Sequence, residues 1–190
     1  IYFGYDSLLF PFEYVPVYPA VIGALTRIFG VGMWYERALS LCGALGIAAI
    51  IFRTVQKRSA GWAALCGALL FFAPAPLAVW YIVRGIDVLA AFLSLAGVAL
   101  IAGSQGNMKR TGIAVVVFTL AFYTKQTAVF PAMAAFAYLA LERRWKETIV
   151  FAAGLSGLSG AVFVVLQALS GGWFFENAFL MTSNNPYYLS

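Results

Sequence analysis

Long apolar stretches recur along the chain and are separated by short polar segments. Their lengths of about 16–22 residues suit helices that cross a hydrocarbon core of roughly 30 Å. The stretches are Glu36–Phe52, Ala60–Ile82, Asp87–Gly103, Gly112–Leu141 and Thr148–Leu169. The fourth is interrupted at Lys125 and counts as two helices, so the pattern predicts six spans.

The apolar stretch Val15–Gly30 precedes these spans and allows two interpretations. Tyr18 and Arg27 make it amphipathic, which favours a helix that lies along the outer membrane surface. The alternative is a crossing helix that turns back in the cytoplasm at Val31–Tyr35. This alternative would move every later basic loop outside, so we favour the surface helix.

The composition excludes a soluble domain. Of the 190 residues, 63% are hydrophobic and 10% are charged, whereas soluble domains have about a quarter charged residues. A soluble fold of this size could not bury so much apolar surface. We therefore predict an all-α polytopic membrane protein with one transmembrane domain over 1–190. An outer loop with its juxtamembrane helix covers 1–35, six spans cover 36–169, and an outer polar-aromatic segment covers 170–190.

Basic residues set the orientation of these spans. Eight of the 12 Lys and Arg residues lie in three tight loops: Arg53, Lys57, Arg58, Lys109, Arg110, Arg143, Arg144 and Lys146. The positive-inside rule places these loops in the cytoplasm. A pair of spans separates each loop from the next, so all three loops fall on one side. This topology explains the net charge of +5 without a nucleic-acid partner.

The opposite face carries further charged residues and three aromatic clusters. The charged residues there are Asp6, Glu13, Glu36, Arg37, Arg84, Asp87, Lys125 and Glu176, and the aromatic clusters are Trp34–Tyr35, Trp80–Tyr81 and Trp173–Phe175. Aromatic belts of this kind mark a membrane interface. We expect an active site on this exoplasmic or periplasmic face.

Arg84 and Asp87 lie where one span ends and the next begins. Asp87 is placed at a helix N-terminus, which stabilises a negative charge. The two residues either form a local pair that caps the helix or face a polar cavity, and we favour the cavity because charge near a membrane is costly.

Lys125 interrupts a pair of helices that are too short to cross the membrane. The flanking stretches of 12 and 16 residues reach about 18 and 24 Å, less than the ~30 Å core. A polar turn at that depth needs protein or water around it. Lys125 is therefore predicted to line a cavity and to bind a phosphate; the alternative is a lysine that snorkels to the surface.

Other residue types limit the chemistry. The chain has no histidine, and Cys42 and Cys66 lie within apolar stretches, where we expect small buried hydrophobic residues and no disulfide. An Asp-x-Asp motif is absent, which argues against metal-dependent use of a nucleotide sugar. We expect no metal-ligating residues and no cofactor, and whether a divalent metal is needed stays open.

The segment Gly171–Ser190 combines aromatic rings with amides, including Asn184 and Asn185. Such a segment suits the binding of a sugar or a lipid head group. A plain interfacial loop fits it equally well.

Four segments, in this order, resemble the membrane glycosyltransferases of the GT-C superfamily, close to glycosyltransferase family 39 and the dolichyl-phosphate-mannose protein mannosyltransferases. They are Glu13-Tyr-Val-Pro-Val-Tyr-Pro19 with its helix ending in Arg27-Ile-Phe-Gly30, Val83-Arg-Gly-Ile-Asp87 with Leu89-Ala-Ala-Phe-Leu93, Phe122-Tyr-Thr-Lys-Gln126, and Gly171-Gly-Trp-Phe174 with Asn184-Asn-Pro-Tyr187. The resemblance covers nearly the whole chain.

The resemblance implies a further span before the surface helix and a catalytic Asp or Glu in the first outer loop. Asp6 is too close to Pro16 for that role, so we expect the chain to be a fragment whose catalytic residue lies upstream of Ile1. Lys125, Arg84 and Asp87 are the candidates for donor phosphate binding. Candidate substrate-binding residues are Glu13, Tyr14, Tyr18, Asn184 and Asn185.

The predicted function is transfer of a sugar from a polyprenyl-phosphate donor, held in the bilayer, to an unidentified acceptor outside a bacterial-type plasma membrane. A transporter or flippase is the alternative, although the chain shows no inverted internal repeat of the kind that many transporters carry. A non-catalytic membrane subunit would leave the polar residues of one face unexplained.

Overall fold

The computed structural model describes residues 15–73 and 85–180. Several predicted features therefore lie outside the described residues: Asp6, Glu13, Tyr14, Trp80–Tyr81, Arg84, Asn184 and Asn185. The described residues are helical and contain no strand. The helices are α1 (Val17–Phe29), α2 (Trp34–Gln56), α3 (Gly61–Leu70), α5 (Gly85–Ala102), α6 (Met108–Phe122), η1 (Gln126–Ala128), α7 (Val129–Leu141), α8 (Trp145–Leu169), α9 (Trp173–Phe175) and η2 (Glu176–Leu180).

Within residues 15–73 and 85–180, three helices are long and apolar enough to cross a membrane: α2, α5 and α8. Shorter helices occupy the predicted positions of the other spans. Helix α3 ends at Leu70 with Phe71 as its C-cap, and the later part of the predicted stretch Ala60–Ile82 lies outside the described residues. The prediction of an all-α polytopic membrane protein is confirmed in class. Several helices begin before their apolar stretch; α6 starts at Met108 because the Asn107 side chain accepts hydrogen bonds from the Lys109 and Arg110 amides, at 3.0 and 3.3 Å.

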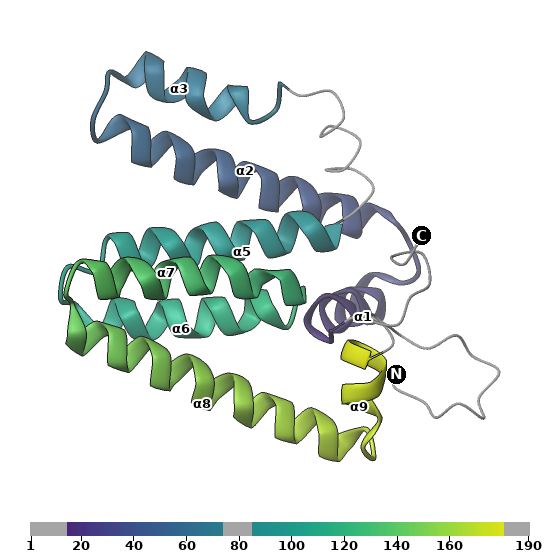
Figure 1. The fold of residues 1–190 in the computed structure, drawn as a ribbon. Coiled ribbons are helices and arrows are strands. Elements are labelled where there is room, and N and C mark those ends of the chain that lie inside the picture. Colours follow the sequence, from purple (N-terminus) through teal and green to yellow (C-terminus); the bar gives the residue numbers. More distant parts are fainter. Residues whose placement is uncertain (1–14, 74–84, 181–190) are drawn as a thin grey trace, which may run out of the picture.

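The five helices α2, α5, α6, α7 and α8 run alongside one another, and α3 packs on the outer side of α2 (Figure 1). The loops that follow α2, α5 and α7 all lie at one end, here called the basic end (Figure 1). The α6–α7 turn and the first residues of α2 and α5 lie at the opposite end, called the Lys125 end. The prediction that the three basic loops share one side is thus met by the helix directions.

Helix α1 lies crosswise to the bundle at the Lys125 end, where Figure 1 shows it almost along its axis. The Thr26 hydroxyl of α1 lies 2.7 Å from the Tyr35 hydroxyl of α2, and the Gly32 amide, in the linker between the two helices, donates to the same hydroxyl at 3.3 Å. This direction agrees with a helix that lies along a membrane surface and disagrees with a crossing helix.

The central packing uses small residues and a few aromatic rings. Phe118 and Phe151 meet edge to face at 5.5 Å between centroids, within a cluster that includes Ala114, Ala132 and Leu139. A Cβ on Gly97 would lie 2.8 Å from the Phe118 ring, so glycine lets α5 approach α6. Membrane helices pack closely through such small residues.

The expectation that Cys42 and Cys66 are buried is wrong, since both thiols are free and exposed on the bundle surface. An apolar neighbourhood in a membrane protein includes lipid as well as protein. Hydropathy alone therefore does not separate a core position from a lipid-facing one.

Candidate functional site

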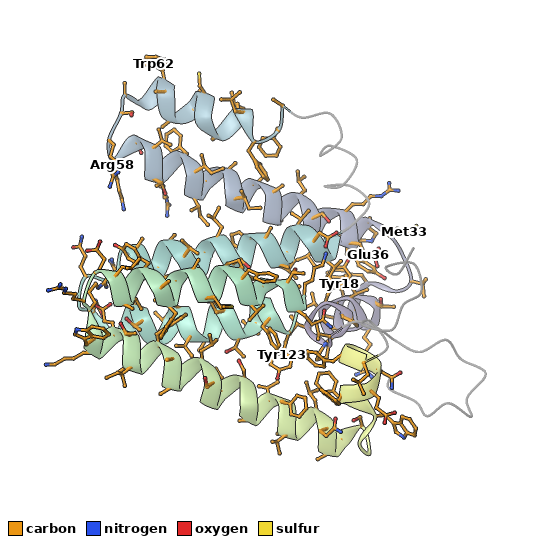
Figure 2. The ribbon with its side chains drawn as sticks, in the orientation of Figure 1. Tyr18, Met33, Glu36, Arg58, Trp62 and Tyr123 are labelled. Atoms are coloured by element: carbon orange, nitrogen blue, oxygen red, sulfur yellow. The ribbon has the colours of Figure 1, made fainter. Side chains whose placement is uncertain are left out.

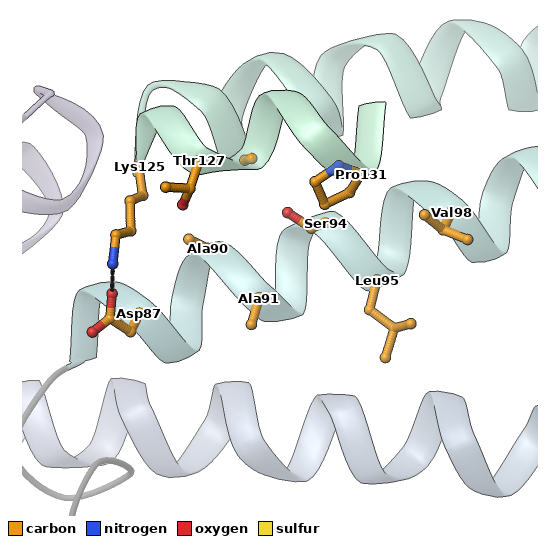
Figure 3. Close-up of a pocket in the computed structure, with 10 residues that line it drawn as sticks. Asp87, Ala90, Ala91, Ser94, Leu95, Val98, Lys125, Thr127 and Pro131 are labelled. Carbon is orange, nitrogen blue, oxygen red and sulfur yellow. Dashed lines mark hydrogen bonds and ion pairs between the residues drawn. The ribbon is translucent and has the colours of Figure 1, made fainter. Parts of the chain in front are cut away.

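Lys125 and Asp87 form an ion pair at the Lys125 end (Figure 3). Asp87 lies in the first turn of α5, and Lys125 lies in the turn between α6 and η1. The two side chains are 37% and 24% exposed, so the pair is partly screened yet still open to a ligand. The structure therefore joins two residues that are 38 positions apart in the sequence.

The turn that carries Lys125 is fixed from three sides. The Val17 amide of α1 donates to the Tyr123 carbonyl at 2.9 Å. The Tyr123 hydroxyl donates to the Ser159 carbonyl of α8 at 2.6 Å. The Gln126 side-chain amide donates to the Ala178 carbonyl of η2 at 2.7 Å. A lysine on so constrained a turn is preorganised, because little backbone freedom is lost when it binds an anion.

The turn is also recessed. Helix α6 has 15 residues and α7 has 13, which gives about 22 and 20 Å at 1.5 Å per residue. Helices α2 and α8 have 23 and 25 residues and extend past the turn at this end (Figure 1). The Lys125 charge thus lies below the ends of its neighbours, as the short apolar stretches predicted.

A groove of about 400 Å³ runs from the ion pair along α5 and α7 (Figure 3). Its polar residues, Asp87, Lys125 and Thr127, lie at one end, and Ser94 lies further along. The rest of its lining is apolar: Ala90, Ala91, Leu95, Val98, Ala128 and Pro131. From Asp87 to Val98 the helix advances about 16 Å. The groove is therefore charged at its mouth and apolar over a length close to half of a ~30 Å hydrocarbon core.

The first residue of α5 packs against α1 and α2. A Cβ on Gly85 would lie 2.6 Å from the Tyr18 hydroxyl and 2.8 Å from the Ser40 hydroxyl. Ser40 is fully buried, and its hydroxyl has no hydrogen-bond partner among the described residues. Burial, and to a lesser extent the negative charge of Glu36, raise the pKa of the Tyr18 phenol. Tyr18 thus stays protonated at neutral pH, and its hydroxyl packs against Gly85.

Replacing Gly85 by Ala is expected to lower turnover several-fold. The added methyl group has no room beside Tyr18 and Ser40, and overpacking of this kind costs about 1–3 kcal/mol or shifts the backbone. A shift at Gly85 moves Asp87, two residues further on, away from Lys125. Gly112→Ala is the matched control, since a Cβ there meets nothing within 4 Å. Equal turnover of both variants in a sugar-transfer assay would show that Gly85 does not position Asp87.

The structure brings together some of the residues proposed from the sequence. Lys125 and Asp87 come together, whereas the proposed Arg84 lies outside the described residues. Tyr18 packs against Gly85 and is not among the residues that line the groove. Sequence reasoning missed the anchoring residues Val17 and Tyr123. The contact between them joins two backbone groups and has no side-chain signature, and the Tyr123 hydroxyl reaches a carbonyl 36 positions away on α8.

No group of three or more Asp, Glu or Cys side chains that could hold a metal ion occurs within residues 15–73 and 85–180.

The fold and the site define a class: a polytopic α-helical membrane protein with a recessed cation beside an apolar groove. The family profile described as dolichyl-phosphate-mannose-protein mannosyltransferase matches residues 13–167, which is most of the chain. The chain belongs to this family and is a membrane glycosyltransferase of the GT-C type. Comparisons with curated proteins and with solved structures gave no match.

Proposed function

We propose that this protein transfers a sugar from a polyprenyl-phosphate donor to an acceptor hydroxyl on the exoplasmic side of a bacterial-type plasma membrane. The observation that carries the proposal is the shape of the groove, which is charged at its mouth and apolar along its length. A lipid-linked sugar phosphate has the same order of parts. Its phosphate would lie at Lys125, and the first isoprene units would lie along Ala91, Leu95 and Pro131.

Sugar transfer from a lipid phosphate requires stabilisation of the negative charge that develops on that phosphate. The acceptor oxygen bonds to the anomeric carbon, the bond from that carbon to the phosphate oxygen breaks, and the acceptor proton passes to a base. The departing lipid phosphate gains a second negative charge, which the Lys125 ammonium would stabilise. Asp87, engaged by Lys125, holds the amine in place before the donor arrives. It is the one carboxylate among the groove-lining residues, so we expect the base to come from outside the groove. Arg84, three residues before Asp87, is proposed as a second cation for the phosphate.

Labelling from the two sides of the membrane tests the orientation. We expect single cysteines at Gln56 and Met33, in a background without Cys42 and Cys66, to react from opposite sides. Gln56 ends α2 at the basic end, and Met33, 71% exposed, precedes α2 at the Lys125 end. The positive-inside rule predicts that the Met33 position reacts from outside. Labelling of both from the same side, or Gln56 from outside, would contradict this orientation.

A donor comparison tests the function itself. The purified full-length protein in vesicles is supplied with a radiolabelled sugar, either on a polyprenyl phosphate or on a nucleotide. We expect transfer from the lipid-linked donor alone. Transfer from the nucleotide sugar alone would refute the donor class, and movement of the lipid-linked sugar across the bilayer without transfer would support a flippase instead.

A further inference from the structure

A second groove lies between α2 and α3. It encloses about 290 Å³ and has apolar walls that include Leu45, Ala49, Leu65 and Leu69. Its one charged lining residue is Arg53, in the last turn of α2 at the basic end. From Leu45 to Arg53 the helix advances about 12 Å, which is close to the depth of one leaflet in a ~30 Å core. This length suits an acyl chain that enters from the leaflet on the basic side.

The mouth of this groove carries positive charge without an acidic partner. Arg53, Lys57 and Arg58 lie within six positions, and all three are exposed. No Asp or Glu occurs in the sequence between Arg37 and Asp87. The ion pairs among the described residues are Lys125 with Asp87 and Arg144 with Glu147. These three cations are therefore available to an anion from outside the chain.

The other basic loops differ from this one. The Arg144 side chain is engaged by Glu147, and Arg110 donates to the Gly103 carbonyl at 2.6 Å. Beside the α2–α3 loop, Trp62 is 74% exposed at the start of α3 (Figure 2), a residue type that favours the membrane interface. Free cations, an interfacial tryptophan and an apolar groove thus coincide at one place.

We propose that the α2–α3 groove binds an anionic phospholipid of the surrounding bilayer. One acyl chain lies along Leu45, Ala49 and Leu65, and the lipid phosphate lies at Arg53, with Lys57 and Arg58 adding to the positive potential. The lipid-linked sugar donor is not the occupant, because the α6–α7 turn that carries Lys125 lies at the opposite end of the bundle (Figure 1). The proposal depends on the membrane setting and not on the sugar-transfer reaction.

Native mass spectrometry of the delipidated full-length protein in detergent tests whether the α2–α3 groove binds an anionic phospholipid. Phosphatidylglycerol and phosphatidylcholine with identical acyl chains are titrated separately. We expect the wild-type protein to bind phosphatidylglycerol more tightly than phosphatidylcholine. In Arg53→Gln/Arg58→Gln the affinity for phosphatidylglycerol should fall about tenfold or more, because each basic residue near an anionic lipid contributes roughly fivefold to the affinity. Lys109→Gln/Lys146→Gln removes the same charge from exposed residues at the same end and should retain the lipid.

A groove-filling variant separates the site from general charge effects. Ala49 is exposed and lines the groove, so Ala49→Phe fills it without changing a charge and should abolish retention. It also decides the question if the double arginine variant does not fold. Equal retention of the two lipids, equal loss in the lysine control, or full retention by Ala49→Phe would each overturn the proposal. A dimer that Ala49→Phe dissociates would assign the groove to a second copy of the chain instead, and would also overturn it.

Discussion

Lys125→Ala is expected to lower the rate of sugar transfer at least tenfold while the protein stays inserted and folded. The α6–α7 turn that carries Lys125 is recessed below the ends of α2 and α8, and Lys125 is the one cation among the residues that line the groove. A hydrogen bond to a charged group contributes about 1.5–3 kcal/mol, which corresponds to a factor of roughly 10 to 150 in rate. Turnover is measured with the lipid-linked donor in vesicles, with insertion checked by protease protection.

Three further variants show whether the lysine acts on the donor or merely holds Asp87. Lys125→Arg should retain part of the activity, because arginine keeps the charge but changes its shape. Asp87→Asn breaks the same ion pair and leaves the lysine in place. If phosphate binding is the role, Asp87→Asn should be the milder change. Lys146→Ala, at an exposed position of the basic end, is the matched control. Wild-type turnover in Lys125→Ala would refute phosphate binding by Lys125. Equal losses of turnover in Lys125→Ala and Asp87→Asn would show that the ion pair has a structural role.

The sequence predicted the place of Lys125 because that argument depended on lengths. Two apolar stretches that are each too short for the bilayer have to leave their polar turn recessed, whatever the detail of the packing. Spacing along the sequence does not predict the ion-pair partner of Asp87. Arg84 is three positions away and Lys125 is 38 positions away. A local Arg84–Asp87 pair was the alternative to a polar cavity. The structure pairs Asp87 with Lys125, and Arg84 lies outside the described residues. Such a contact depends on how α5 packs against the α6–α7 turn.

The sequence also does not distinguish the buried apolar positions of a membrane helix from the exposed ones. Cys42 and Gly43 are neighbours on α2. A Cβ on Gly43 would lie 3.1 Å from the Val88 side chain, whereas Cys42 is exposed. Helix α2 is apolar on all sides, so no hydrophobic periodicity marks its packed face. In water the exposed face would be polar; in lipid it needs no polarity, and the sequence signal for burial is lost.

The basic end contains a buried polar cluster that sequence reasoning did not find. Glu147 is 3% exposed and accepts hydrogen bonds from the Ser104 hydroxyl at 2.6 Å, the Gly106 amide at 2.7 Å, the Thr111 hydroxyl at 3.2 Å and the Arg144 Nε at 2.8 Å. These donors come from the α5–α6 loop, the first turn of α6 and the residue before α8. One carboxylate thus holds together the ends of helices that are otherwise joined by apolar packing.

Glu147→Ala is expected to be the most destabilising single change at the basic end. It removes the carboxylate from the Arg144 guanidinium and from the Gly106 amide. The Ser104 and Thr111 hydroxyls lose it too but keep the Ile101 and Asn107 carbonyls as acceptors. Removing one partner of a buried ion pair costs about 3–5 kcal/mol. For a chain of this size that corresponds to a fall of roughly 6–20 °C in the unfolding midpoint, on the scale of soluble domains, measured in detergent by thermal unfolding. Glu142→Ala is the control, because Glu142 is an exposed acid in the same loop, where substitutions change stability by about 0.5 kcal/mol or less. Glu147→Met/Arg144→Met should recover part of the loss, since no buried charge is then left unpaired. Equal midpoints for Glu147→Ala and Glu142→Ala would mean that apolar packing alone holds these helix ends together.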